Sequence, residues 1–232
     1  MTIRLTSLFT TLLLGAMLVV AARTASAQVA PSAGEAAGYQ GLHAAAHAGN
    51  AARIAELAAA GDDLETKDGN GRTPVHVAAF ASHEDALTAL AVAGADMNAL
   101  DDDAYDAVTI AAVANDIDML KTALAAGNRA DNITSRYVGT ALIAAAHLGH
   151  HEVVKVLIDA GAPLDHVNNL GWTAVMEAVV LGDGGPDHVA TVRALVEAGA
   201  DTSIPDREGV TPLQHAMARG YDEIVAILGA AR

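Results

Sequence analysis

Histidine and carboxylate side chains at short spacings are the groups of this chain best suited to metal chemistry. His43 and His47 lie four positions apart, which places both imidazoles on one face of a helix, the spacing of a metal-ligand pair. The acidic run 101–103, followed by Asp106, could attract calcium. It lacks the glycine and glutamate of an EF-hand loop, so a solvated acidic turn is the favoured interpretation. A third polar cluster is His150-His151-Glu152.

Motifs of nucleophilic and phosphate chemistry are absent. The sequence contains no cysteine, which excludes thiol nucleophiles, disulfides and cysteine-based zinc sites. It has no G-x-S-x-G elbow, no glycine-rich phosphate loop and no H-E-x-x-H pair. Asn132-Ile133-Thr134 fits a glycosylation sequon, a match that is common by chance. We therefore predict no enzyme activity, no cofactor and no metal, the alternative being a metal-binding or hydrolytic protein that uses His43 and His47 or the acidic turn.

Composition and charge favour a helical protein that does not bind nucleic acid. Apolar residues make up 52% of the 232 residues but aromatic residues only 3%, which disfavours an all-β fold. The abundant alanines favour helices that pack closely. A formal net charge of -15 repels nucleic acid.

Two markers repeat along the chain with the same irregularities. The first marker is a threonine or the residue that replaces it: Gln40, Thr73, Asp106, Thr140, Thr173 and Thr211. These six positions, called the threonine register, are separated by 33, 33, 34, 33 and 38 residues. The other is a glycine with steps of 33, 33, 34 and 38: Gly61, Gly94, Gly127, Gly161 and Gly199. Each threonine, or Asp106, can cap the start of a helix, and each glycine permits the left-handed conformation that ends the next one.

The repeated phrases resemble the ankyrin repeat family. Thr-Pro-Val-His-Val-Ala-Ala from Thr73 and Thr-Pro-Leu-Gln-His-Ala from Thr211 are similar to its T-P-L-H-x-A core, whose period is about 33 residues. The resemblance covers 39–232 and implies an all-α solenoid of six stacked helix-turn-helix repeats with protruding turns. Expected bounds are 39–67, 68–100, 101–133, 134–167, 168–205 and 206–232, with an insertion at 181–187 in the fifth repeat.

The resemblance also changes the interpretation of the histidines. His43 and His76 occupy the histidine of the family core, where the imidazole forms hydrogen bonds between neighbouring turns, so a structural role is favoured over metal binding. His150 matches the family's Gly-His turn, and a structural role is favoured there too.

The scarce aromatic residues map to the positions that form the concave binding face in ankyrin proteins. These are turn positions 2, 3 and 5 and helix positions 13 and 14, when the threonine is numbered 6. We therefore predict partner-binding residues Tyr39, Arg72, Phe80, Asp102, Asp103, Tyr105, Arg136, Tyr137, His147, Leu170, Trp172 and Arg207; the same positions include Leu148 and Leu181. Aromatic side chains are enriched at interface hot spots. The alternative is that these rings brace neighbouring turns.

The first residues predict export. Arg4, an uncharged apolar run at 8–22 and Ala25-Ser26-Ala27 have the order of a secretory signal peptide, predicted at 1–27 with cleavage before Gln28. A membrane anchor is the alternative, but the apolar run is short for a span. Residues 28–38 are predicted to be a flexible linker.

Together these features predict an exported protein–protein interaction module. It would bind a periplasmic protein partner through its concave face, and so inhibit, protect or scaffold that partner. The acidic charge favours a partner with a basic patch. We expect a monomer that contacts neither nucleic acid nor, after cleavage, a membrane. The alternative location is extracellular, where the protein would act as a secreted effector.

Overall fold

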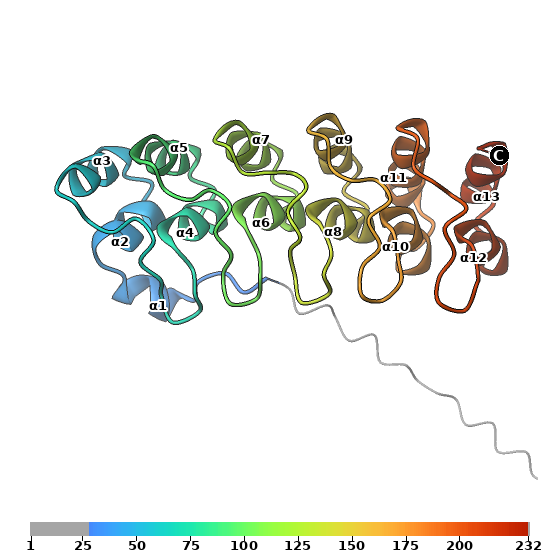
Figure 1. Cartoon of the computed structure of the whole chain (residues 1–232), viewed down its shortest axis with the longest axis horizontal. Helices are drawn as coiled ribbons and strands as arrows, with labels where there is room; N and C mark the ends of the chain where they lie inside the picture. Colours follow the sequence, from blue (N-terminus) through green and yellow to red (C-terminus); the bar gives the residue numbers. More distant parts are fainter. Residues whose placement is uncertain (1–27, 232) are drawn as a thin grey trace, which may run out of the picture.

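The computed structural model describes residues 28–231 as a row of α-helices (Figure 1). A short helix, α1 (Ala33–Gly38), comes first, and six helix pairs follow it in the described part of the chain. The pairs are α2 (Gly41–His47) with α3 (Ala51–Ala59), α4 (Pro74–Phe80) with α5 (Glu84–Ala93), α6 (Ala107–Ala114) with α7 (Ile117–Ala125), α8 (Ala141–Leu148) with α9 (His151–Asp159), α10 (Ala174–Val180) with α11 (Pro186–Glu197), and α12 (Pro212–Arg219) with α13 (Asp222–Ala230). The prediction of an all-α solenoid is confirmed.

The helices form two layers. The first helices of the pairs make one layer and the second helices make the other, while loops between the pairs project beyond the first layer (Figure 1). Each helix packs against its counterpart in the next pair, as α3 does against α5 and α8 against α10. A single pair cannot bury its apolar side alone, so stability comes from stacking.

Threonine and aspartate side chains begin the first-layer helices, as predicted. Asp106 accepts a hydrogen bond from the Thr109 amide at 2.8 Å, and Thr140 accepts one from the Ile143 amide at 3.3 Å. These side chains satisfy amides that the first turn of a helix leaves unpaired. Gln40, in the degenerate first repeat, makes no such bond before α2.

Alanines and larger aliphatic residues divide the core between the layers. Fully buried alanines such as Ala78, Ala111 and Ala145 lie in the first-layer helices. Fully buried leucines such as Leu87 and Leu157 lie in the second layer. Methyl side chains let neighbouring backbones approach, and the leucines fill the space between the layers at interior packing density.

Residues 28–38 depart from the linker prediction. Residues 33–38 form α1, whose first turn is closed by a capping box between Ser32 and Glu35. The linker prediction is therefore wrong for this segment, because a capping box and contacts with the repeats order it. The predicted signal peptide, 1–27, lies outside the described residues.

Candidate functional site

Five hairpins separate the helix pairs on the side of the first layer. The hairpins are 68–72, 101–105, 134–139, 168–172 and 206–210. In each of them the amide of the first residue donates a hydrogen bond of 2.8–3.0 Å to the carbonyl of the last. The hairpins and the exposed side of the first-layer helices bound the surface predicted as the concave face. We use that name for it below.

An aspartate or asparagine shapes four of these hairpins. Oδ1 of Asp68 accepts the amides of Asn70 and Arg72 at 2.9 and 3.0 Å, and Asp101, Asn168 and Asp206 do the same two and four residues ahead. These side chains stabilise the tight turn. Sequence analysis missed this role, although the signal is an Asp or Asn five residues before the threonine register.

Neighbouring hairpins are joined to one another through their backbones. The Asp102 amide donates to the Asn70 carbonyl at 3.1 Å, Ser135 donates to Ala104 at 2.8 Å, and Asn169 donates to Tyr137 at 2.9 Å. Two arginines add side-chain links: Arg136 pairs with Asp103 at 2.5 Å, and Arg207 donates to the Asn169 carbonyl. The hairpins therefore form a connected edge whose shape exists before any partner arrives, which lowers the entropic cost of binding.

The N-terminal segment occupies the first end of this surface. Arg72 is only 1% exposed, and its guanidinium contacts Asp68 and Glu35, each at 2.7 Å, and the Val29 carbonyl at 3.0 Å. The Tyr39 hydroxyl donates to Asp68 at 2.6 Å. The prediction that Arg72 binds a partner is therefore wrong, because the segment around α1 buries it. We call Glu35, Tyr39, Asp68 and Arg72 the N-terminal clasp.

The acids of the N-terminal clasp are held ionised. Hydrogen bonds from Ser32, together with Arg72, lower the pKa of Glu35 to about 2. Burial opposes ionisation of Asp68, but hydrogen bonds from Tyr39, Arg72 and the turn amides outweigh it and lower its pKa to about 2. Both shifts stabilise the fold above the unfolded-state pKa near 4, and this contribution is lost as the pH falls toward 2.

The histidines singled out in the sequence bridge neighbouring repeats. His43 Nε2 lies 2.9 Å from the Arg72 carbonyl, and His150 Nδ1 lies 3.0 Å from the Ala112 carbonyl. His76 Nδ1 accepts the Thr73 amide at 3.0 Å, so its Nε2 carries the proton and donates to the Tyr105 carbonyl at 3.0 Å. The structural interpretation of these three side chains is confirmed. Among residues 28–231, no three histidine or acidic side chains are placed to hold a metal ion.

We expect His76 to make stability depend on pH. Burial lowers the pKa of His76 below its ordinary value. As the pH falls below about 6.5, the unfolded chain binds a proton that the folded chain does not, so the free energy of unfolding decreases. In denaturant titrations between pH 8 and pH 5, the free energy of unfolding should decrease less for His76→Gln than for the unmodified protein as the pH falls. The exposed His47→Gln serves as the control, and identical pH slopes in all three proteins would contradict this expectation.

The open part of the concave face begins beyond the N-terminal clasp. Of the predicted residues, Asp102, Arg136, Tyr137, Leu170 and Arg207 are exposed, whereas Tyr39, Phe80, Asp103, Tyr105, His147 and Trp172 are half-buried. Leu148 and Leu181 are 42% and 44% exposed at equivalent places on α8 and at the end of α10. Sequence analysis missed Val138, which is 46% exposed at the tip of hairpin 134–139 and carries no pattern that marks it.

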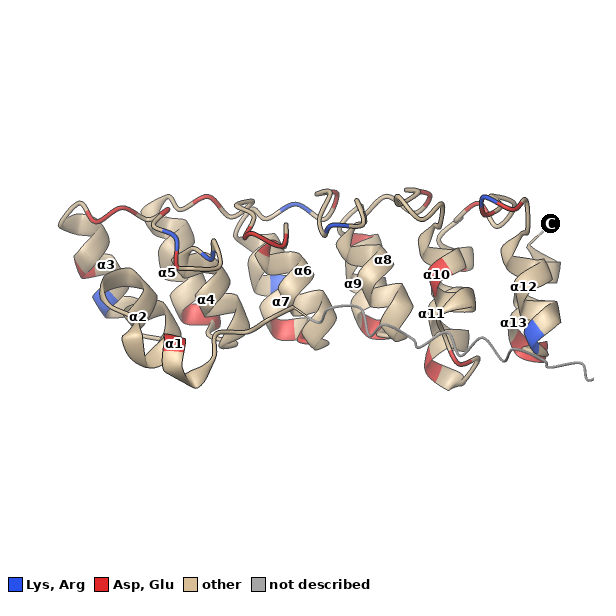
Figure 2. Ribbon diagram, turned by 90° about the horizontal axis from the view of Figure 1, so that it is seen from below, with Lys and Arg blue, Asp and Glu red and all other residues tan. Residues whose placement is uncertain are grey.

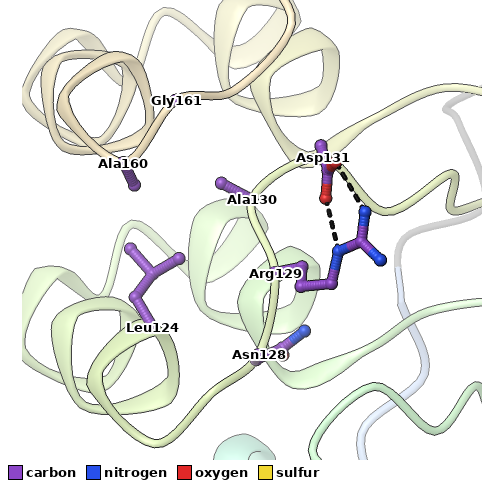
Figure 3. Close-up of a pocket in the computed structure, with 7 residues that line it drawn as sticks. All are labelled: Leu124, Asn128, Arg129, Ala130, Asp131, Ala160 and Gly161. Atoms are coloured by element: carbon purple, nitrogen blue, oxygen red, sulfur yellow. Dashed lines mark hydrogen bonds and ion pairs between the residues drawn. The ribbon is translucent and has the colours of Figure 1, made fainter.

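A small pocket lies between the loops that follow α7 and α9. It has a volume of about 320 Å³, and Figure 3 shows Leu124 and Ala160 facing it. Arg129 lies at its edge, with two nitrogens bound to the Asp131 carboxylate at 2.7 and 2.8 Å (Figure 3). This arginine is already neutralised, so we assign the pocket no function.

The fold, the repeated helix starts and the row of hairpins define an ankyrin repeat protein. The chain belongs to the ankyrin repeat family, whose sequence profile, described as ankyrin repeats (3 copies), matches residues 17–101 and 108–206. The recognition made from the sequence is confirmed.

Individual relatives support the same family. The putative ankyrin repeat protein YahD of Escherichia coli is 40% identical over 101 residues, which are 43% of this chain and 50% of YahD. The chain thus spans half the length of that relative, and only 3% of the ankyrin repeat and KH domain-containing protein mask-1 of Caenorhabditis elegans, to which it is 36% identical over 86 residues.

Solved structures share the fold over more than four fifths of this chain. An ankyrin repeat domain from Acinetobacter baumannii AYE is 40% identical with a TM-score of 0.77, and covers 82% of this chain and 96% of its own. The ankyrin repeat domain of Bcl-3, a member of the IkappaB protein family, is 26% identical with a TM-score of 0.74, over 84% and 86% of the chains. Ankyrin repeats are generally non-enzymatic modules that bind protein partners. Within residues 28–231, no helix has the length and apolar character needed to cross a membrane.

Proposed function

We propose that this protein is an exported interaction module that binds a protein partner through the concave face at the third to fifth helix pairs. The observation that carries the proposal is the group of exposed apolar side chains there. Tyr137, Val138 and Leu170 lie on hairpins that are already joined to one another, and Leu148 and Leu181 lie at the ends of α8 and α10. Exposed apolar patches on soluble proteins mark interaction sites. The N-terminal clasp leaves these residues free.

The charge of the chain supports a basic partner. The net charge is -15, and acidic side chains are spread over the loops and helix ends along the length of the solenoid (Figure 2). Charge complementarity raises the rate of encounter more than it raises affinity. Binding should therefore slow as ionic strength rises, because salt screens exposed charges.

The proposed location is the periplasm, supported by the signal-like order of residues 1–27. Extracellular action is the second candidate, since the same leader serves both destinations. Cell fractionation separates the two: recovery in the periplasmic fraction supports the proposal, and recovery mainly in the medium supports the extracellular effector.

We expect Tyr137→Ala combined with Leu170→Ala to weaken partner binding by roughly 30-fold or more, the effect of removing interface hot spots. The partner is captured by crosslinking to the purified protein and its affinity is then measured by calorimetry. Both side chains are 39% exposed, so the fold should persist, which the far-UV circular dichroism spectrum checks.

The matched control is Val92→Ala. Val92 is an apolar residue 84% exposed on α5, in the second layer and away from the concave face. If Val92→Ala weakens binding and the double variant does not, the partner uses the other layer and the proposed face is wrong.

A further inference from the structure

One first-layer helix carries a carboxylate where its counterparts carry other side chains. Glu177 of α10 is only 4% exposed. It lies four residues after the threonine register, and the corresponding residues of the other repeats are Ala44, Val77, Ile110, Ala144 and His215. A buried carboxylate is costly unless hydrogen bonds or a positive charge compensate for the lost water.

The polar contacts of Glu177 leave one of its oxygens without a hydrogen bond. Oε1 accepts a hydrogen bond from Asn168 Nδ2 at 2.8 Å, and Asn168 also shapes hairpin 168–172. Oε2 has no hydrogen-bond partner among the described residues. The closest ionisable group is His147 Nδ1, at 3.3 Å, but this contact lacks hydrogen-bond geometry. Oε2 is thus a buried oxygen that can still accept hydrogen bonds.

This oxygen lies beneath the open part of the concave face. The His147 side chain is 32% exposed at the end of α8, and it is the group next to Oε2. Exposed apolar residues lie at the ends of α8 and α10 and on the hairpins that precede these two helices: Leu148, Leu181, Tyr137 and Leu170. An incoming side chain would displace the partly exposed imidazole, a rotamer change that takes picoseconds to nanoseconds.

We propose that Glu177 is the anchor for a lysine or arginine side chain of the protein partner. The cation binds Oε2, and the aliphatic stem packs on the exposed apolar residues, as such stems do on apolar surfaces. The net charge of -15 favours a cation in the same place. This inference rests on the proposed function, because it concerns the same face and names the chemistry of the group that it receives.

The test uses peptides as probes. A phage-displayed library of random dodecapeptides is selected on the purified protein at 150 mM salt, and peptides lost with the Tyr137→Ala and Leu170→Ala double variant are kept. We expect these peptides to share a lysine or arginine. Replacing that residue with norleucine should weaken binding to the unmodified protein roughly 30-fold, the scale for one partner of a desolvated charge pair.

The decisive comparison is with Glu177→Gln, which keeps the acceptor for Asn168 and removes the charge. It should weaken the basic peptide roughly 30-fold and leave the norleucine peptide unaffected. Glu197→Gln changes the net charge equally at an exposed site on α11 and should change neither affinity. A thermal unfolding midpoint for Glu177→Gln at or above that of the unmodified protein shows that folding is intact.

The outcomes separate this inference from the proposed function. Peptides that need Tyr137 and Leu170 but bind Glu177→Gln equally well overturn the anchor and leave the binding face standing. Equal losses with Glu177→Gln and Glu197→Gln also overturn the anchor, because the effect is then one of overall charge. If no selected peptide depends on Tyr137 and Leu170, the proposed face and the anchor fail together.

Discussion

Asp68→Ala is expected to lower the free energy of unfolding of the N-terminal repeats by about 3–5 kcal/mol, the effect of removing the buried partner of a buried charge. Arg72 is 1% exposed, and Asp68 is its buried counter-ion at 2.7 Å. The remaining acid, Glu35, has a side chain 38% exposed and pairs with the other end of the guanidinium. Hydrogen exchange of the amides in α1–α3, measured against denaturant, reports the loss locally.

Two variants separate the charge from the turn. Asp101→Ala removes the same two turn hydrogen bonds from the next hairpin, where the residue at the end of the turn is Tyr105 rather than an arginine, and should cost about 1–3 kcal/mol. Asp68→Asn keeps the turn acceptor, as Asn168 does naturally, and removes the charge opposite Arg72. The loss of unfolding free energy for Asp68→Asn should lie between the losses for Asp101→Ala and Asp68→Ala. Equal losses for Asp68→Ala and Asp101→Ala would show that the N-terminal clasp contributes nothing.

Gly71→Ala should cost about 2–5 kcal/mol, the combination of left-handed strain and overpacking. Gly71 has φ +71°, and a Cβ there would lie 2.8 Å from the Asp102 backbone nitrogen and even closer to the Asp102 side chain. The Asp102 amide is the one that joins hairpin 101–105 to hairpin 68–72. The next hairpin would therefore have to move, and denaturant unfolding measures the loss.

Gly209→Ala is the matched control for this prediction. Gly209 occupies the same place in hairpin 206–210 with φ +79°, but a Cβ there meets no atom within 4 Å. Only the left-handed strain applies, about 1–2 kcal/mol. If the two alanine variants unfold at the same denaturant concentration, the hairpin junction is not tightly packed and the connected edge is weaker than the hydrogen bonds indicate.

Local signals in the sequence were enough for the architecture. The threonine register predicted the helix starts at Asp106, Thr140, Thr173 and Thr211, because a cap depends on residues only two or three positions away. The step of 34 before Thr140 appears as the longer hairpin 134–139. The structural role of His76 followed from the family core that contains it.

The burial and the hydrogen-bond partners of individual side chains could not be predicted from local sequence, because they depend on residues far away in the chain. Arg72 occupies a turn position typical of a binding residue, yet α1 and its flanks bury it through Glu35 and Val29, 37 and 43 residues away. The sequence shows Glu177 only as a carboxylate where the other first-layer helices carry other side chains. That its Oε2 is buried without a hydrogen bond, with His147 as its neighbour, depends on how α8 packs against α10.

The repeat period, the helix boundaries and the family thus follow from the chain alone, because caps, left-handed glycines and small apolar residues act over one or two helical turns. Three-dimensional packing decides which part of the concave face is free and which buried carboxylate oxygen lacks a hydrogen bond. Burial and charge compensation depend on which segments meet across the stack, and residues far apart in the chain determine that.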